Sequence, residues 1–536
     1  MKVSGFLVFS VFLSVFAVYA YTAYPTVAPR DSADLAAAVL TFTPAHPPGY
    51  PLYVLLGKAW LTLDPWGDAA YRLNVLSALA GAGTVACVFA LLNAAVGLWP
   101  ALGAALALAF SASLWKFSLL GEMYALHALF LSILLFLAPG WREGELALER
   151  RACWSAFLCG LALVNHQAFV LALPGLAILW WKKLDRQVFV RRILPLFSLG
   201  LSCYVLLWIW TGDLSRAWAI LTRQEYGTFQ LSSGLSRPMT GDLAWGLLQH
   251  LGVGLWQVTT APALLLALLG SWELKQRRPR WGLGLAVLFL CLGPGFFLMT
   301  RFDLSGWVAR TVLESAFIAP ALLICIAAGF GLAGIGRRRS WGAAVLALLL
   351  AGWSLWSHAA GAFHRDDFSA YDYAMDLRRS LPPGSAAAVA GDTALYVSRY
   401  FELAHGDGRG RRLVDFQDAK SSDDFQWVSG VPLEKIARLG SVEKLRPAGL
   451  MQTWSSDAAG RDQAFWAVSV LRPASALRRG ESYARDILLS YAVAHYIAGR
   501  ILEPRQEARY AWNYIWAAAL DPEDFRVMLT PNTPGH

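Results

Sequence analysis

The chain has 536 residues, of which 56% are hydrophobic and 15% are charged, and its mean hydropathy is +0.44. A soluble protein of this length would carry about 25% charged residues, so the composition excludes an ordinary soluble protein and indicates a polytopic membrane protein. The formal net charge is +9, which an excess of Lys and Arg in cytoplasmic loops would explain. No basic patch interleaved with aromatic residues supports nucleic-acid binding, so no nucleic-acid partner is expected.

The predicted membrane helices begin with residues 4–21, an apolar segment after Lys2 that is interpreted as an uncleaved first helix with its N-terminus inside. Residues 22–72 are then an external loop, long enough to need surface helices of its own. A membrane helix needs only about 20 residues, so the long apolar run 152–181 is predicted to split into two short helices at Asn165-His166-Gln167. The other predicted spans lie near residues 73–97, 100–118, 121–138, 193–210, 252–271, 282–299, 312–335 and 341–360.

Loop charge supports this count of about eleven transmembrane helices. With the N-terminus inside, the dense Lys/Arg clusters at 141–151, 182–192, 273–280 and 336–340 all fall in cytoplasmic loops. The external loops near 211–250 and 300–311 hold only scattered basic residues. If 152–181 were one helix, the later clusters would lie outside, and the split is therefore preferred.

Composition changes after residue 360, which divides the chain into a transmembrane domain, 1–360, and a soluble domain, 361–536. The soluble domain should begin with a small α/β unit, a strand, a helix at 392–406 and a second strand. Residues 482–499 and 506–519 predict a helical pair that resembles part of a tetratricopeptide repeat. With eleven spans the whole soluble domain is extracytoplasmic. The six cysteines all fall in apolar segments, so no disulfide framework or zinc site is expected.

The most distinctive stretch is Asp31–Tyr53, DSADLAAAVLTFTPAHPPGYPLY. Asp31 and Asp34 would share one face of a helix, since they are three residues apart. The double proline before Gly49 forbids helix, and the glycine permits a turn. Tyr50 is of the amphipathic type that favours a membrane–water boundary. The stretch predicts a short surface helix with an acidic start, followed by a stiff bend.

This stretch, continued as VLLGKAW, resembles the signature of the domain-of-unknown-function family 2723. That family includes the transmembrane protein 260-like protein O-mannosyltransferases of the C superfamily of membrane glycosyltransferases. The similarity extends more weakly through residues 1–330. The resemblance implies an integral membrane enzyme that transfers a sugar from a polyprenyl-phosphate donor to an extracytoplasmic protein or glycan acceptor. The expected location is the bacterial inner membrane. Mannose is the sugar that the eukaryotic relatives suggest.

By this resemblance Asp31 is the expected general base. A carboxylate must take the proton of the acceptor hydroxyl as it attacks the anomeric carbon, and direct displacement inverts that centre, so one base suffices. The alternative for Asp31 is a helix N-cap, and the two roles are compatible. Asp34 stands in DSAD where the family carries a DSGE-like pattern. It either orients substrate and tunes the pKa of Asp31 by like-charge repulsion, or is a surface charge at a helix N-terminus.

Two more segments hold expected substrate-binding residues. His46 either donates to a phosphate oxygen or holds the turn, and Tyr50 follows it in the matched HPPGYP run. Glu122, with Tyr124 within a turn, is an ionisable residue at the outer end of a membrane segment. Glu122 either lines the substrate cavity, binds a divalent cation, or pairs with Lys116.

Asn165 and His166 match a family Asn-His pair at the helix break, close to the carrier phosphate; the alternative is a hydrogen-bonded plug that stabilises the break. Arg223, on an external loop, is expected to clamp the lipid phosphate, and the alternative is a solvated loop charge. No nucleotide-cradling loop or HExxH metal motif occurs, so the sugar should arrive on a lipid. No protein metal site is predicted, and a divalent cation is the one cofactor that stays open.

Two other functions stay open at this stage. A transporter or flippase for lipid-linked sugars would share the apolar helices and Glu122. Transporters usually show broken helices at matching positions in two halves, and the sequence shows one early break without a later counterpart. A non-catalytic scaffold would use the exported helical pair to recruit partners.

Overall fold

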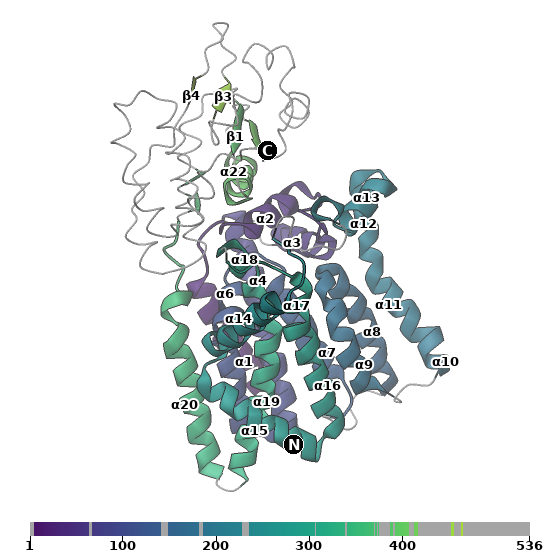
Figure 1. The fold of residues 1–536 in the computed structure, drawn as a ribbon, viewed down its shortest axis with the longest axis vertical. Helices are drawn as coiled ribbons and strands as arrows, with labels where there is room; N and C mark the ends of the chain where they lie inside the picture. The colour runs from purple at the N-terminus through teal and green to yellow at the C-terminus, as the bar shows by residue number, and fades with distance from the viewer. Residues whose placement is uncertain are drawn as a thin grey trace. The chain divides into compact units, whose positions relative to one another are not determined.

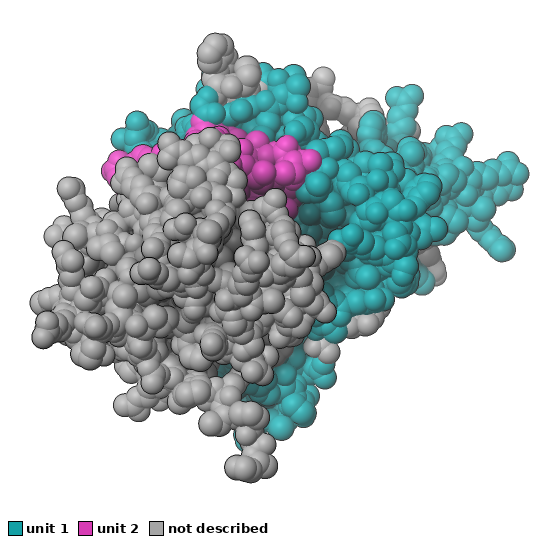
Figure 2. All heavy atoms as spheres, turned by 90° about the horizontal axis from the view of Figure 1, so that it is seen from above, with its two compact units in different colours: residues 1–23, 42–67, 71–365 teal, residues 24–41, 68–70, 366–536 magenta. Residues whose placement is uncertain are grey.

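The computed structural model describes residues 5–63, 67–140, 148–181, 186–227, 235–305, 307–337, 340–368, 370–371, 373–374, 386–389, 392–406, 412–415, 452–454 and 463–464. The chain forms two compact units, coloured separately in Figure 2. Unit 1 comprises residues 1–23, 42–67 and 71–365, and unit 2 comprises residues 24–41, 68–70 and 366–536. The sequence assigned 24–41 to the transmembrane domain, whereas in the structure this segment groups with the C-terminal part of the chain. The predicted domain limits themselves stay a prediction.

Unit 1 is helical throughout its described residues (Figure 1). Its first half contains α1 (Gly5–Thr22), α3 (Pro51–Leu63), α4 (Ala69–Val96), α5 (Leu98–Ala109), α6 (Ala112–Phe117), α7 (Tyr124–Leu137), α8 (Leu148–Asn165), η1 (Gln167–Ala172), α9 (Leu173–Trp180), α10 (Arg186–Val188), η2 (Phe189–Ile193), α11 (Leu194–Leu201), η3 (Ser202–Tyr204) and α12 (Val205–Thr211). The second half contains α13 (Leu214–Leu221), η4 (Gln224–Tyr226), α14 (Gly241–Thr259), α15 (Ala261–Arg277), α16 (Pro279–Leu290), η5 (Cys291–Gly295), α17 (Phe296–Thr300), α18 (Trp307–Val312), η6 (Glu314–Phe317), α19 (Ile318–Gly336), α20 (Ser340–His358) and η7 (Ala360–Ala362).

Among the described residues, six helices are long and apolar enough to cross a membrane alone, and up to seven if a bent pair counts as one span. The remaining predicted spans correspond to shorter elements. The predicted span 100–118 is two helices, α5 and α6, and the span 121–138 is α7. The predicted split of 152–181 is confirmed, because α8 ends at Asn165 and His166 has an extended backbone before η1.

The predicted single span 252–271 is wrong. The structure places α14 and α15 on either side of Thr260, with an angle of 105° between the two helices. Thr260 has φ 71°, a left-handed conformation that ends α14. Pro262 at the start of α15 suits a helix N-terminus. Thr259, Thr260 and Pro262 interrupt the apolar run in the sequence, but the bend was not predicted from them.

The helix ends next to the four basic loop regions, as far as the structure describes them, lie at one end of unit 1 (Figure 1). Ion pairs and hydrogen bonds join them. Arg337, after α19, pairs with Glu273 in α15, and Arg278, after α15, donates to the carbonyl of Gly140 after α7. Loops that the sequence assigned to one side of a membrane are therefore neighbours. The surface helix α3 and the short helix α13 lie at the opposite end of the unit.

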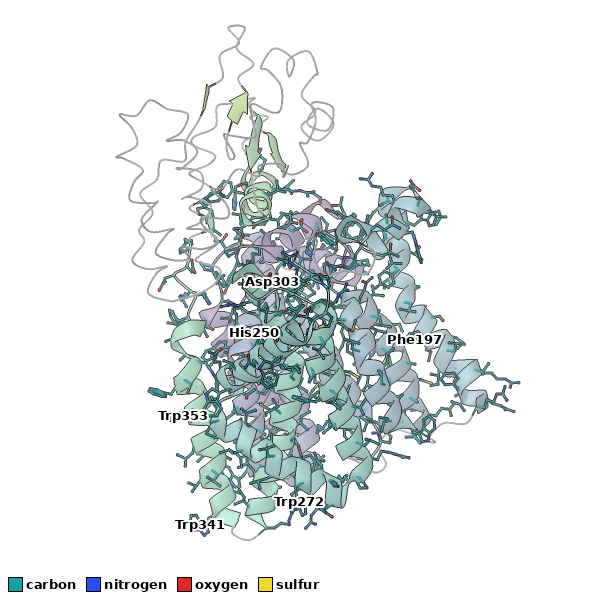
Figure 3. The ribbon with its side chains drawn as sticks, viewed as in Figure 1. Phe197, His250, Trp272, Asp303, Trp341 and Trp353 are labelled. Atoms are coloured by element: carbon teal, nitrogen blue, oxygen red, sulfur yellow. The ribbon has the colours of Figure 1, made fainter. Side chains whose placement is uncertain are left out.

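Large apolar side chains project outward from unit 1. Trp272, Trp341 and Trp353 are 61%, 65% and 50% exposed, and Figure 3 shows them at the margin of the helices. Soluble proteins rarely expose such surfaces, whereas a bilayer covers them. The chain is therefore an integral membrane protein, as the composition indicated.

Glycines bring helix backbones together inside unit 1. α15 and α19 make the most extensive helix contact in the described part of the chain. A Cβ on Gly270 would overlap the carbonyl oxygen of Ala327, and one on Gly331 would overlap that of Leu266. Small residues are used in this way where membrane helices cross closely.

We expect Gly270→Leu to unfold unit 1 or lower its stability by about 3 kcal/mol, because the side chain must displace the backbone of α19. Gly252→Leu in α14 is the matched control, since nothing lies within 4 Å of its Cβ position. Melting of both variants in one detergent, followed by size-exclusion chromatography, makes the measurement. Equal melting temperatures would contradict the close crossing.

The described part of unit 2 contains α2 (Asp31–Thr41), α22 (Asp392–His405) and strands β1 (Ala386–Val389), β2 (Arg412–Asp415), β3 (Gln452–Trp454) and β4 (Gln463–Ala464). The strands form one sheet in the order β2-β1-β3-β4. β1 and β2 are parallel with Ala386 opposite Arg412, and α22 is the crossover between them. The predicted strand–helix–strand unit is therefore confirmed. The predicted helical pair at 482–519 lies outside the described residues.

Candidate active site

The predicted bend after α2 is confirmed. The amide of Gly49 donates to the carbonyl of His46 at 2.8 Å, and the amide of Ala45 donates back to Gly49 at 3.3 Å. Gly49 has φ +86°, and a Cβ there would lie 2.7 Å from Leu207. Both the backbone and the space therefore require glycine at this position. The bend carries His46 and Tyr50 into unit 1.

The His166 ring is the centre of an aromatic cluster in unit 1. Its centroid lies 6.4 Å from that of Tyr50, 5.5 Å from Tyr124 and 5.3 Å from His127. The ring of His46 in turn lies 5.1 Å from that of Tyr50. Four predicted residues, far apart in sequence, are thus brought together with His127. We call these five residues the His166 cluster.

The hydrogen bonds at the break support part of the plug interpretation. Asn165 donates through Nδ2 to the carbonyl of Met123 at 3.1 Å, and Gln167 donates through Nε2 to the carbonyl of Leu221 at 2.7 Å. These two bonds hold the interrupted run against α7 and α13. His166 lies between them, and its ring faces the cluster.

Three polar atoms at the break remain without a hydrogen-bond partner within the described residues. They are Nδ1 of His166, Nδ1 of His127 and Oδ1 of Asn165, and all three are buried. Buried polar atoms in native proteins nearly always have partners. These atoms therefore mark a place where a polar ligand or water would be satisfied.

Arg223 adds positive charge to the cluster. The positive charge of Arg223 acts on the His166 ring. Arg223 has a left-handed backbone, φ 57°, and its guanidinium lies 5.0 Å from the centre of the Tyr226 ring. Non-glycine residues held in this conformation often occur at functional sites. The arrangement suits an anionic group, which the cluster's own side chains do not supply.

Glu122 lies between α6 and α7 and is only 2% exposed. Its main-chain carbonyl accepts a hydrogen bond from Ser77 Oγ at 3.3 Å. The pKa of Tyr53 in the surface helix α3 is raised, first by burial and then by the negative charge of Glu122. The predicted alternative gave Glu122 the partner Lys116. Lys116 forms a 2.7 Å ion pair with Glu314, which lies far along the chain and could not be found from local spacing; the pairing with Glu122 stays a prediction.

Asp31 and Asp34 belong to unit 2, and the structure does not group them with the other predicted residues. Both lie in the first turn of α2, where the helix dipole favours carboxylates. Asp31 is half-buried and Asp34 is 3% exposed. α2 begins at Asp31 itself, whereas an N-cap role for Asp31 would need the helix to begin at Ser32. Asp34 is buried, so it is not a surface charge, but its place in the first turn agrees with the helix N-terminus of that alternative.

No group of three or more His, Cys, Asp or Glu side chains in the described part of the chain is placed to hold a metal ion. The divalent cation considered from the sequence stays a prediction. Two further arginines, Arg301 and Arg310, lie on the loop between α17 and α18 and in α18. Among the described residues, neither has a ring contact or hydrogen bond with the His166 cluster, and Arg310 donates to the carbonyl of Leu304 at 2.7 Å.

The sequence missed His127 and Tyr53 as site residues. His127 follows Tyr124 by three positions in an otherwise apolar helix. An ionisable residue in such a helix, on the face of a predicted site residue, was the available signal. Tyr53 is fully buried in α3. It is close to Glu122 only in the folded chain, so the sequence could not show this.

The comparisons with known proteins fit this geometry. Residues 31–188 match the family described as the N-terminal domain of protein O-mannosyl-transferase TMEM260. The expected resemblance to this family is confirmed over residues 31–188. The matched segment contains α2, the bend and the whole His166 cluster.

Two curated relatives of the chain carry the name protein O-mannosyl-transferase TMEM260. The Mus musculus protein is 29% identical over 475 residues, which cover 80% of this chain and 64% of that protein. The Dictyostelium discoideum protein is 26% identical over 457 residues, which cover 73% of this chain and 55% of that protein. The chain thus spans less than two thirds of either relative.

Among solved structures, ArnT from Cupriavidus metallidurans bound to undecaprenyl phosphate is similar with a TM-score of 0.51. Sequence identity is 13%, and the match covers 79% of this chain and 94% of that chain. The predicted fold class, a polytopic membrane protein with the C-type glycosyltransferase fold, is confirmed.

Proposed function

We propose that the chain is a membrane glycosyltransferase that transfers a sugar from a polyprenyl phosphate to a hydroxyl of a protein or glycan acceptor. The observation that carries the proposal is the His166 cluster inside the family-matched segment. There the buried Nδ1 atoms of His166 and His127 have no hydrogen-bond partner among the described residues. The names of the two relatives favour mannose and a protein acceptor. ArnT, of similar fold, was solved with a polyprenyl phosphate bound, which favours a lipid-linked donor.

In this reaction Asp31 acts as general base. It takes the proton of the acceptor hydroxyl while the oxygen attacks the anomeric carbon. The bond between that carbon and the phosphate oxygen breaks on the opposite face of the sugar, so the configuration of the anomeric carbon is inverted. Polyprenyl phosphate leaves as the anion. Asp34, in the same turn of α2, orients the acceptor.

The His166 cluster and Arg223 hold the donor phosphate. A protonated or neutral imidazole donates to phosphate oxygen, and Arg supplies a permanent charge close to His166. Tyr50 and Tyr124 offer ring faces to the sugar or the first isoprene units. Glu122, buried between α6 and α7, completes the polar lining. These groups stabilise the charge that develops on the leaving phosphate.

We place the active site and unit 2 outside the cytoplasm. Lys- and Arg-rich loops favour the cytoplasmic side, and the basic loops of unit 1 lie at the end opposite α3 and α13. A bacterial inner membrane is the setting we favour, because a polyprenyl carrier is available there.

The test is a transfer assay with purified full-length protein in nanodiscs. Polyprenyl-phosphate mannose and an acceptor peptide rich in Ser and Thr are supplied, and products are detected by mass spectrometry. Mannosylated peptide with release of polyprenyl phosphate is expected. Absence of any glycosylated product, over a panel of polyprenyl-phosphate sugars and acceptors, would refute the enzyme.

One observation favours a second candidate, a transporter of lipid-linked sugars. The 105° bend between α14 and α15 is a later helix break, which the sequence did not indicate and which transporters often have. The same protein in proteoliposomes separates the two functions. Movement of a labelled lipid-linked sugar between leaflets without product would identify the transporter.

A further inference from the structure

The acidic helix α2 packs in unit 2 against α22, a helix from the C-terminal part of the chain. The inner residues of α2 are mostly alanine, among them Ala36 and Ala37, which are almost fully buried. Val397 and Phe401 of α22 are equally buried. Because short side chains allow close approach of two helices, the position of α2 depends on the position of α22.

Tyr400 fixes α22 to a third segment. Its hydroxyl accepts a hydrogen bond from the amide of Ala70 and donates to Oδ2 of Asp68, both at 3.0 Å. Nε2 of His405 lies 3.2 Å from the same carboxylate oxygen. We call Asp68, Ala70, Tyr400 and His405 the Tyr400 clasp. It joins the last two turns of α22 to the residues where α4 begins.

Aromatic rings pack on one side of the clasp. The His405 ring lies 5.0 Å from that of Phe401 and 5.9 Å from that of Tyr371, and the two latter rings are 5.2 Å apart. Tyr400 itself is fully buried, whereas His405 at the edge of the clasp is exposed. The hydrogen bond from Ala70 to Tyr400 is buried and the one from Tyr400 to Asp68 is partly buried. Hydrogen bonds shielded from water are stronger than exposed ones, so the attachment depends mainly on Tyr400.

We propose that Tyr400 is a positioning residue, which holds α2 and its two carboxylates in place through α22. The proposal rests on the proposed function, in which Asp31 is the base. α2 has only 11 residues, and helices of this length are marginal in water without tertiary packing. Loss of the clasp frees α22, and α2 loses the surface that keeps its first turn fixed. A misplacement of about 1 Å is enough to slow a reaction by about a hundredfold.

Tyr400→Phe tests the proposal, because it removes the hydroxyl and keeps the ring. In full-length protein in nanodiscs, hydrogen–deuterium exchange of residues 32–41 should become about tenfold faster, and kcat for sugar transfer should fall about tenfold with an unchanged KM for the donor. Tyr371→Phe is the matched control. It removes the hydroxyl of Tyr371, which belongs to the same group of rings and has no hydrogen bond among the described residues. The exchange rate of residues 32–41 and kcat should both match wild type.

If the hydrogen–deuterium exchange of α2 is unchanged in Tyr400→Phe, the positioning role of Tyr400 is refuted, whatever the activity of the variant. Asp31→Asn tests the proposed function separately, because it should abolish sugar transfer without changing the exchange of α2. If Tyr400→Phe does not fold, Asp68→Asn replaces it, since the amide still accepts from Tyr400 but loses the charge that faces His405. A smaller rise in α2 exchange is then expected, and wild-type exchange would again overturn the proposal.

Discussion

Asp31→Asn is expected to lower kcat for sugar transfer by about a thousandfold, because a general base contributes about 10²- to 10⁴-fold and an amide cannot take the proton. The substitution keeps the size of the side chain and removes its negative charge. The base is therefore lost, while the first turn of α2 should be retained. Transfer by the purified variant, measured over the full range of acceptor concentration, makes the test.

Asp242→Asn is the matched control for this variant. Asp242 also lies in the first turn of a helix, α14, and is exposed. Its substitution should leave the rate within twofold of wild type. An Asp31→Asn enzyme with more than about a tenth of wild-type kcat would exclude Asp31 as the base.

His166→Leu is expected to raise the KM for the polyprenyl-phosphate donor at least tenfold, with a smaller change in kcat. A hydrogen bond to a charged group is worth about 1.5–3 kcal/mol, and the unpartnered ring nitrogen of His166 is the best placed of the buried polar atoms. Donor titrations give KM, and binding of polyprenyl phosphate alone, followed by native mass spectrometry, gives affinity without turnover.

His250→Leu serves as the control for His166→Leu. His250 is another histidine of unit 1, and its ring contacts those of Phe297 and Phe317. Donor affinity should be unchanged in this variant. Equal affinities in the His166 variant and wild type would remove the cluster from the donor site.

The acidic helix shows how far local chemistry determines structure. The spacing of Asp31 and Asp34, the alanine-rich run and the proline pair predicted a helix and a bend, and both are present. Backbone preferences and capping act over a few residues, so they can be predicted from adjacent positions. The packing of α2 on α22 was not predicted, because the two helices are far apart in sequence and neither has a pattern that names its partner.

For the candidate site too, the sequence showed individual residues but not their contacts. The sequence marked His46, Tyr50, Tyr124 and His166 individually, through motif resemblance and the cost of polar groups in apolar segments. It did not show that their rings meet, that His127 joins them, or that Lys116 pairs with Glu314. Such contacts depend on how the interrupted run at 165–167 folds against α7 and the bend.

By itself the sequence determined that the chain is a membrane protein, the position of most of its helices, the helix break at His166 and the resemblance to the family over residues 31–188. Hydropathy, proline and short motifs are local features, and they suffice for those conclusions. Only the tertiary structure decided that α14 and α15 are bent at Thr260, that α2 groups with the C-terminal segment, and which buried polar atoms have no hydrogen-bond partner among the described residues. These features arise from long-range packing, where burial and hydrogen bonding are shared between residues that no sequence window contains.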